Sequence, residues 1–286
     1  MDFLLTSILD GLLLGFVYGL AAMGLTLIWG VMNVINLSHG PIISLGMFGV
    51  YLLFSGLGIN PYVALIFVAI FGLLLGIVIY FVAVNRVINA PHLSTLLATF
   101  SVAMIITGLG TAVFSASPRN VDYSLGSFTL GSATIPINRI VAAALSMLIT
   151  AGLYIYLRRT RSGRYIRAVA NNRNAAELMG VPSVRILALS FGIGTMLATV
   201  AGGLIATLFP FTILAGGTYE LKSFVIGVLG GLGNPVGALL GGLILGVLEG
   251  IIPTFMPATW VPVIEFILFV LILMVRPQGL FGAKKS

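Results

Sequence analysis

Long apolar runs separated by short polar breaks fill most of the chain. Because a transmembrane helix needs about 20 mostly apolar residues, we expect an all-α, polytopic bundle of about eight or nine membrane segments, which include discontinuous helices, in one domain. The alternation typical of a membrane β-barrel is absent from the sequence. The expected segments are residues 3–30, 41–57, a third ending near 84, 94–116, 140–157, 186–210, a short piece at 223–229, 238–252 and 260–275.

Composition supports a membrane protein. Hydrophobic residues make up 59% of the chain and charged residues 7%, whereas charged residues are roughly a quarter of a soluble domain. The first segment carries Asp2 and Asp10 and lacks a basic leader region, so we interpret it as an uncleaved span. Gly11, Gly15 and Gly19 recur every fourth residue there, and such small-residue faces allow close helix packing in lipid.

The basic residues predict the orientation. The net charge is +7, and residues 158–185 contain half of the 14 basic residues and a single acidic one, Glu177. These arginines lie beside apolar spans, which is the positive-inside pattern and not a nucleic-acid-binding face, so we expect a cytoplasmic loop and no nucleic-acid partner. Arg276, Lys284 and Lys285 place the C-terminus on the same side. Counting spans backwards places residues 117–138 and the N-terminus outside.

A catalytic constellation is not found in the sequence. His39 and His92 lie far apart, HExxH and GxSxG are missing, and the chain has no cysteine for a nucleophile or a thiolate metal site. The phosphate-binding pattern GxxxxGK[ST] is also missing. We therefore expect no enzyme activity, metal or cofactor on this chain, and if ATP powers the protein, a separate subunit binds it.

Two interrupted segments predict a translocation path. NLSHGP near the start and GGLGNPVG near the end occupy comparable positions of the two halves, and matching broken helices indicate a binding path in transporters. A tight turn at the membrane surface is the alternative for each break. We expect His39 to form a hydrogen bond at a helix end instead of relaying protons. The predicted path residues are Asn33, Asn36, Ser38, His39, Gly231, Gly233 and Asn234.

Three carboxylates, Asp10, Glu249 and Glu265, lie in apolar surroundings. Acidic residues within a membrane can mark ion coupling, so an ion-coupled secondary transporter is one alternative. The predicted topology places all three towards the outer ends of their spans, which favours hydrogen bonding between helices. A structural or scaffold membrane protein is a further alternative.

The basic loop contains a predicted short helix. Asn174 and Glu177 fit a capping box, Gly180 fits a C-cap, and Pro182 ends the element. A helix of one to two turns is marginal in water, so we expect a partner surface for it. Arg164 and Arg167 lie three apart on one face of a second helical piece, and the arginines also suit lipid headgroups.

This loop resembles a known family. Ala175-Ala176-x-x-x-Gly180 is similar to the E-A-A-x-x-x-G signature of ABC importer permeases, with Asn174 in place of the usual Glu. The whole chain resembles the permease subunit of Liv-type branched-chain amino acid ABC importers, although NLSHG stands where N-F-A-H-G is commoner. The matching stretches are GLTLIWGVMNVINLSHG (24–40), TRSGRYIRAVANNRNAAELMGV (160–181), VIGVLGGLGNPVGALLGG (225–242) and RPQGLFG (276–282).

The resemblance implies a permease in the inner (plasma) membrane of a bacterium or archaeon. Its implied partners are a second related permease, two ABC ATPase subunits that bind ATP and Mg²⁺, an extracytoplasmic substrate-binding protein and the lipid bilayer. The same family also serves urea, short amides and aromatic acids, so the cargo stays open. The ATPase-coupling residues expected from the loop are Arg164, Arg167, Asn174, Ala175, Ala176, Glu177, Leu178 and Gly180.

Overall fold

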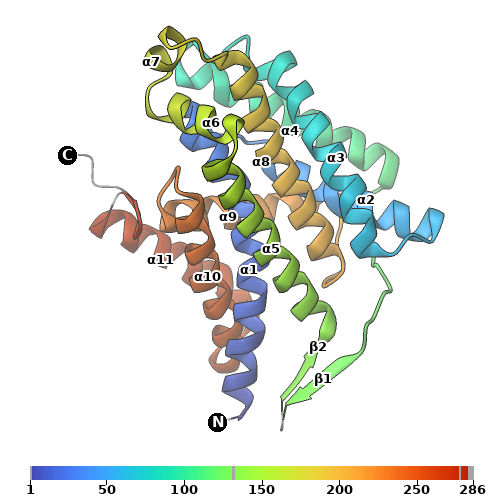
Figure 1. Cartoon of the computed structure of the whole chain (residues 1–286). Helices are drawn as coiled ribbons and strands as arrows, with labels where there is room; N and C mark the ends of the chain where they lie inside the picture. The colour runs from blue at the N-terminus through green and yellow to red at the C-terminus, as the bar shows by residue number, and fades with distance from the viewer. Residues whose placement is uncertain (1, 131–132, 277, 283–286) are drawn as a thin grey trace.

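The computed structural model describes residues 2–130, 133–276 and 278–282, and it is a helical bundle (Figure 1). Among these residues, nine segments are long and apolar enough to cross a membrane, which confirms the predicted all-α polytopic class. Lys284 and Lys285, which entered the orientation argument, and Pro277 lie outside the described residues. The helices are α1 (Asp2–Met32), α2 (His39–Leu57), α3 (Pro61–Ile79), α4 (His92–Phe114), α5 (Ile137–Arg159), α6 (Arg161–Asn171), α7 (Arg173–Leu178), α8 (Ser183–Ala206), α9 (Gly216–Gly230), α10 (Pro235–Phe255) and α11 (Val261–Val275).

Helix α1 is the long central element, and its 31 residues span roughly 46 Å. Its predicted glycine face packs directly on α10. A Cβ atom at Gly11 would meet the backbone of Gly246, and one at Gly15 would meet the backbone of Gly242 and Leu243. Side chains at these positions would separate the two helices, so the glycines permit the close approach that van der Waals packing in lipid requires.

Helix α8 forms the other half of the buried centre. Leu197, Ala198 and Ala201 are fully buried, and threonines on the same helix contact α3. The Oγ1 atom of Thr195 donates to the carbonyl oxygen of Gly72 at 2.8 Å, and that of Thr199 donates to the carbonyl oxygen of Val68 at 3.2 Å. These hydrogen bonds satisfy hydroxyl groups in an apolar interior and fix the two helices in register.

The end of the bundle that carries the N-terminus also carries a β-hairpin (Figure 1). Strands β1 (Ser127–Leu130) and β2 (Ala133–Pro136) pair antiparallel within the region 117–138, which the sequence predicted as a polar loop. Asn138, the last residue of that expected loop, instead lies in α5, and its Nδ2 donates to the carbonyl oxygen of Tyr123 at 2.6 Å. The hairpin escaped prediction because its strands have only four residues each.

Helix α2 begins inside the bundle. After Met32 the chain leaves α1, turns back through residues 33–38 and starts α2 beside the middle of α1, where His39 Nε2 lies 2.9 Å from the carbonyl oxygen of Ala21. His39 is therefore a helix-end hydrogen-bonding residue, as expected. Thr99 of α4 holds the broken segment, because its Oγ1 donates to the carbonyl oxygen of Ile35 at 3.1 Å.

The short apolar segment expected at 223–229 is part of a longer helical segment, so its predicted length is wrong. A 3₁₀ turn (Ile213–Ala215) leads directly into α9, so a continuous segment of 18 residues, Ile213–Gly230, is long enough to cross. The expected apolar piece begins after Glu220 and Lys222, whose charges are costly at membrane depth. In the structure both lie on the helix, where each has an interhelical partner.

Candidate functional site

The helices of the basic loop, α6 and α7, lie at the end of the bundle opposite the N-terminus (Figure 1). Thr160 caps α6 by accepting a hydrogen bond from the backbone N–H of Gly163 at 2.9 Å. Gly163, Ile166 and Val169 form the buried face, while Arg164 and Arg167 lie on the exposed face. The amphipathic pattern therefore seats α6 on the bundle and presents its arginines outward.

Helix α7 is capped at its start by Asn172 and not by Asn174. The Oδ1 atom of Asn172 accepts a hydrogen bond from the backbone N–H of Ala175 at 3.0 Å, whereas Asn174 is an exposed residue within the helix. The predicted capping box is wrong for a second reason, since Glu177 pairs with Arg173 at 3.0 Å. This hydrogen bond holds the pKa of the Glu177 carboxyl below its usual value.

The predicted C-cap of α7 is confirmed. Gly180 has a φ of +81°. Its N–H donates to the carbonyl oxygen of Glu177 at 2.9 Å, and the N–H of Val181 donates to the carbonyl oxygen of Ala176 at 3.0 Å. This pair of bonds is the Schellman arrangement, and the positive φ favours glycine. With both ends capped, a helix of only six residues becomes a defined element.

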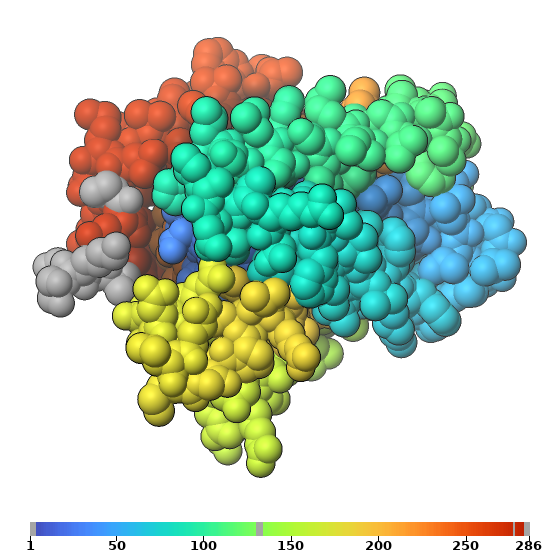
Figure 2. Space-filling view, turned by 90° about the horizontal axis from the view of Figure 1, so that it is seen from above, coloured from blue at the N-terminus to red at the C-terminus, as the bar shows by residue number. Residues whose placement is uncertain are grey.

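The tip of α7 is apolar and exposed. Leu178 is 89% exposed and Met179 84%, whereas Ala176 is buried against the bundle. Arg173 also donates from Nη1 to Oδ1 of Asn89 at 3.3 Å, which connects α7 with the segment between α3 and α4. Two large apolar side chains on a capped, arginine-rich projection are typical of a protein-binding surface. Figure 2 shows this face, where the yellow segment projects beside the teal residues of α4.

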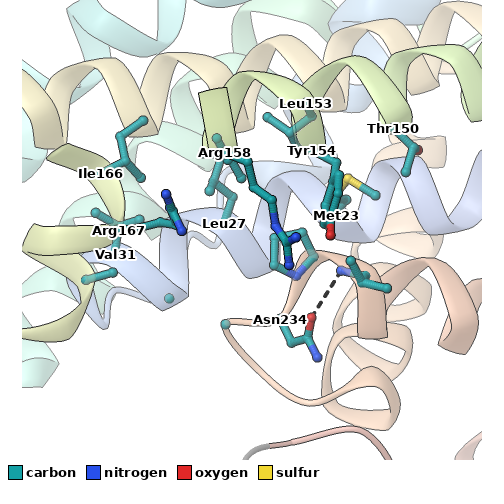
Figure 3. Close-up of a pocket in the computed structure, with 16 residues that line it drawn as sticks. Met23, Leu27, Val31, Thr150, Leu153, Tyr154, Arg158, Ile166, Arg167 and Asn234 are labelled. Carbon is teal, nitrogen blue, oxygen red and sulfur yellow. Dashed lines mark hydrogen bonds between the residues drawn. The ribbon is translucent and has the colours of Figure 1, made fainter. Parts of the chain in front are cut away.

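Three predicted residues, Arg167, Gly233 and Asn234, line a groove between α1, α5, α6 and the start of α10 (Figure 3). The groove has a volume of about 310 Å³, and Arg158 of α5 lines it as well. Asn234 was expected in the path, but it also caps α10, because its Oδ1 accepts from the N–H groups of Val236 and Gly237 at 3.2 Å. The groove is apolar along α1 and basic at its α6 end.

The predicted path residues divide into two groups. Asn36, Ser38 and His39 are buried, and Asn36 Oδ1 accepts hydrogen bonds from the N–H and the Oγ of Ser38 at 3.1 and 2.6 Å. Asn33 is exposed near the end of α1. The turn with Gly231, Gly233 and Asn234 also lies at that end, because Gly233 packs against Gly30. The two breaks are therefore at different depths of the bundle.

The start of α2 instead packs on the start of α9. A Cβ atom at Gly40 would meet the carbonyl oxygen of Gly216 and the side chain of Glu220. The Glu220 carboxylate accepts a hydrogen bond from the backbone N–H of Gly40, one of the free donors in the first turn of α2. Asn36 and Glu220 both line a cavity of about 400 Å³ at this junction.

Glu220 is the residue that sequence reasoning missed. The available signal was the sequence Glu220-Leu221-Lys222 between two apolar stretches. Residues two apart lie on different faces of a helix, and Glu220 accordingly faces α2 while Lys222 faces α10 and α11. A helix assigned from Ile213 onwards would have placed one charge on each face.

The other membrane carboxylates pair with cations, as expected for hydrogen bonding between helices. Asp10 of α1 pairs with Arg139 of α5 at 2.8 Å. Lys222 Nζ lies 2.5 Å from Glu249 and 3.9 Å from Glu265. Within the described ranges, acidic and histidine side chains form no group that could hold a metal ion.

A bundle of membrane-length helices with helix starts inside it and an exposed, capped helix at one end has the architecture of a membrane transport protein. The chain matches the family described as "Branched-chain amino acid transport system / permease component" over residues 7–274. The protein belongs to this family, which confirms the resemblance to Liv-type permeases.

Individual relatives agree over nearly the whole chain. The high-affinity branched-chain amino acid transport system permease protein LivH of Salmonella typhimurium is 30% identical over 298 residues, covering 98% of this chain and 96% of LivH. The corresponding permease protein BraD of Pseudomonas aeruginosa is 28% identical over 301 residues, covering 97% and 95%. The ribose import permease protein RbsC of Escherichia coli is 28% identical over 246 residues, covering 82% and 73%.

Proposed function

We propose that the chain is a permease subunit of an ATP-driven importer for branched-chain or other hydrophobic amino acids in the inner (plasma) membrane. The family and relatives named for branched-chain amino acid transport support this cargo. The observation that carries the proposal is α7, a doubly capped helix with an exposed apolar tip. ATP and Mg²⁺ bind to two separate ATPase subunits, and this chain itself is not an enzyme.

The end of the bundle with α6 and α7 faces the cytoplasm. The arginines of this end support that orientation through the positive-inside rule. The N-terminus and the β-hairpin, at the opposite end (Figure 1), then lie outside, where a substrate-binding protein delivers the cargo. The C-terminus lies inside. Arg158, at the groove of Figure 3, meets anionic lipid headgroups.

Helix α7 couples the permease to an ATPase subunit. Leu178 and Met179 enter a groove of the ATPase, Arg164 contacts its surface, and the Arg173–Asn89 hydrogen bond passes movement to α3 and α4. Closure of the ATPase pair on ATP then rocks this chain against a second, related permease. The proposed coupling residues are Arg164, Arg167, Asn174, Ala175, Ala176, Glu177, Leu178 and Gly180.

The path follows the buried break of α1 and α2. Irregular backbone at membrane depth is tolerated where it is buried in protein or lines a cavity, and Asn36, Ser38 and His39 satisfy this condition. The cytoplasmic end of the path lies beside the last turns of α1 and contains Asn33, Gly231, Gly233 and Asn234.

An ion-coupled secondary transporter has less support. Asp10, Glu249 and Glu265 each pair with a basic side chain, so none of them is an unpaired carboxylate for a transported ion. Urea, short amides or aromatic acids are alternative cargoes within the same transport class, and the binding protein decides among them.

Uptake into membrane vesicles tests the transport class. Vesicles that contain the full importer are given labelled leucine and the binding protein, with either ATP or an ion gradient as the energy source. We expect uptake with ATP only, and loss of uptake when both ATPase subunits carry inactive ATP sites. Uptake that persists with inactive ATPases under an ion gradient contradicts the proposal and favours the secondary transporter.

A further inference from the structure

The groove of Figure 3 runs from the basic loop into the apolar part of the bundle. On α1 its wall extends from Val31 back to Met23, and on α5 it extends from Arg158 back to Thr150. Each pair of residues is eight apart in a helix, which corresponds to about 12 Å of rise. Both helices reach the basic loop at the same end of the bundle (Figure 1), so the groove begins at headgroup level and continues to hydrocarbon depth.

The long walls of the groove are apolar. Leu27 of α1 and Leu153 of α5 are buried at its floor, whereas Tyr154 of α5 and Val236 of α10 line it with 42% and 46% of their surface exposed. Exposed apolar surface of this kind marks a contact with lipid or with another protein. A narrow slot of about 310 Å³ suits a flexible chain better than the broad face of a folded partner.

The headgroup end of the groove is basic. Figure 3 shows the guanidinium groups of Arg158 and Arg167 extending into it from α5 and α6, and among the described residues neither forms a salt bridge. The Arg158 guanidinium lies 4.5 Å from the ring centroid of Tyr154, one turn deeper in the groove. Asn234 is already engaged with α10 and with the C-terminal segment. Two unpaired cations above an apolar slot are complementary to an anionic amphiphile.

We propose that the groove binds one anionic phospholipid of the cytoplasmic leaflet, with its phosphate between Arg158 and Arg167 and one acyl chain along α1 and α5. Guanidinium groups donate to phosphate in a bidentate manner, and basic pockets between membrane helices bind acidic headgroups. The site rests on the orientation given in the proposed function. The lipid bridges α5 and α6 and so holds α6, with the α7 that follows it, against the bundle. Arg167 then serves coupling by fixing α6 and not by touching the ATPase.

Photo-crosslinking tests the site. The assembled importer is placed in phosphatidylcholine nanodiscs with increasing proportions of a phosphatidylglycerol that carries a photoreactive acyl chain, and labelled peptides are identified by mass spectrometry. We expect labelling of the α1 and α5 peptides that line the groove. Unlabelled phosphatidylglycerol should compete, whereas glycerophosphate, which has no acyl chain, should not. A phosphatidylcholine probe with the same photoreactive chain should label the groove weakly, because its headgroup has no net charge.

Two pairs of variants assign the contacts. Arg158→Gln should raise the proportion of phosphatidylglycerol needed for half-maximal labelling about fivefold, as expected for one basic residue beside an anionic headgroup. Arg159→Gln removes the same charge from an exposed neighbour that does not line the groove, and it should leave this proportion unchanged. Ala170→Trp fills the groove and should abolish labelling, whereas Ala168→Trp, on another exposed face of α6, should retain it.

Three outcomes overturn the site: equal labelling by the phosphatidylcholine probe, equal effects of Arg158→Gln and Arg159→Gln, or wild-type labelling of Ala170→Trp. An unlabelled groove in the wild-type importer also overturns it and indicates that another subunit covers this surface. The labelling needs neither ATP nor the binding protein, so it is independent of the uptake experiment. Selective labelling without ATP-driven uptake leaves the site and removes only the proposed function. ATP-driven uptake without selective labelling removes only the site.

Discussion

Gly40 and Gly216 bring two helix starts into backbone contact inside the bundle: a Cβ atom on either glycine would meet the carbonyl group of the other. Gly40 is the second residue of α2, and Gly216 is the first residue of α9. The first turn of α2 and the start of α9 thereby lie against each other, with Glu220 beside them. This contact creates the polar junction within an otherwise apolar interior.

Gly216→Ala tests the contact. Gly216 has a helical φ of −52°, so alanine is not strained in its backbone but clashes with Gly40 and with the Ser44 hydroxyl, and overpacking of this kind costs about 1–3 kcal/mol. Thermal unfolding in detergent should show a lower midpoint temperature for this variant. Gly56→Ala, in α2 with open space around its Cβ position, is the control and should leave the midpoint unchanged or slightly higher. Equal midpoints for both variants would show that the glycine contact is unimportant.

Because Lys222 pairs with Glu249 and Glu265, we expect substitutions of Lys222 and Glu249 to have non-additive effects on the free energy of unfolding. Lys222→Met leaves Glu249 and Glu265 without their cation, and an uncompensated buried charge costs about 3–5 kcal/mol. Adding Glu249→Gln to Lys222→Met should recover part of that loss, because the second change removes one orphaned charge. The free energy of unfolding for wild type, both single variants and the double variant measures this coupling. Additive losses would indicate that these residues do not interact.

Asn172 caps α7 and Asn174 does not, so substitutions of the two residues should have different effects. Asn172→Ala removes the hydrogen bond to the Ala175 N–H and should destabilise the helix by about 1 kcal/mol, whereas Asn174→Ala should have little effect. Amide hydrogen exchange over residues 173–181 is the measurement. Faster exchange in Asn172→Ala alone is the expected result, and faster exchange in Asn174→Ala alone would restore the capping box expected from the sequence.

The membrane helices and the glycine face of α1 could be predicted from the sequence. Apolar runs located the membrane helices, and the four-residue spacing of Gly11, Gly15 and Gly19 located the face of α1 that packs on α10. These signals are repeated over many residues, so single exceptions do not obscure them. The C-cap at Gly180 was equally clear, because a positive φ strongly favours glycine.

The local assignments were less certain for a physical reason. Asn172 and Asn174 are equally good capping residues, and only the actual helix start decides between them. The Ile213–Gly230 segment was cut short because the tertiary partners that compensate Glu220 and Lys222 come from distant parts of the chain. The pairing of the starts of α2 and α9 also depends on tertiary packing, which the two Gly/Pro-rich breaks alone did not reveal.

We propose that α7 couples ATP hydrolysis in the ATPase subunits to transport. The most direct measurement is the ratio of leucine uptake to ATP hydrolysis in proteoliposomes with the complete importer, for wild type, Leu178→Asp and the control Leu57→Asp. Both leucines are highly exposed, at 89% and 71%, so neither change disturbs the core. A charge buried in the ATPase groove should lower the ratio at least about tenfold in Leu178→Asp, with wild-type amounts of protein in the membrane and an unchanged ratio in Leu57→Asp. A wild-type ratio in Leu178→Asp would contradict the docking of α7.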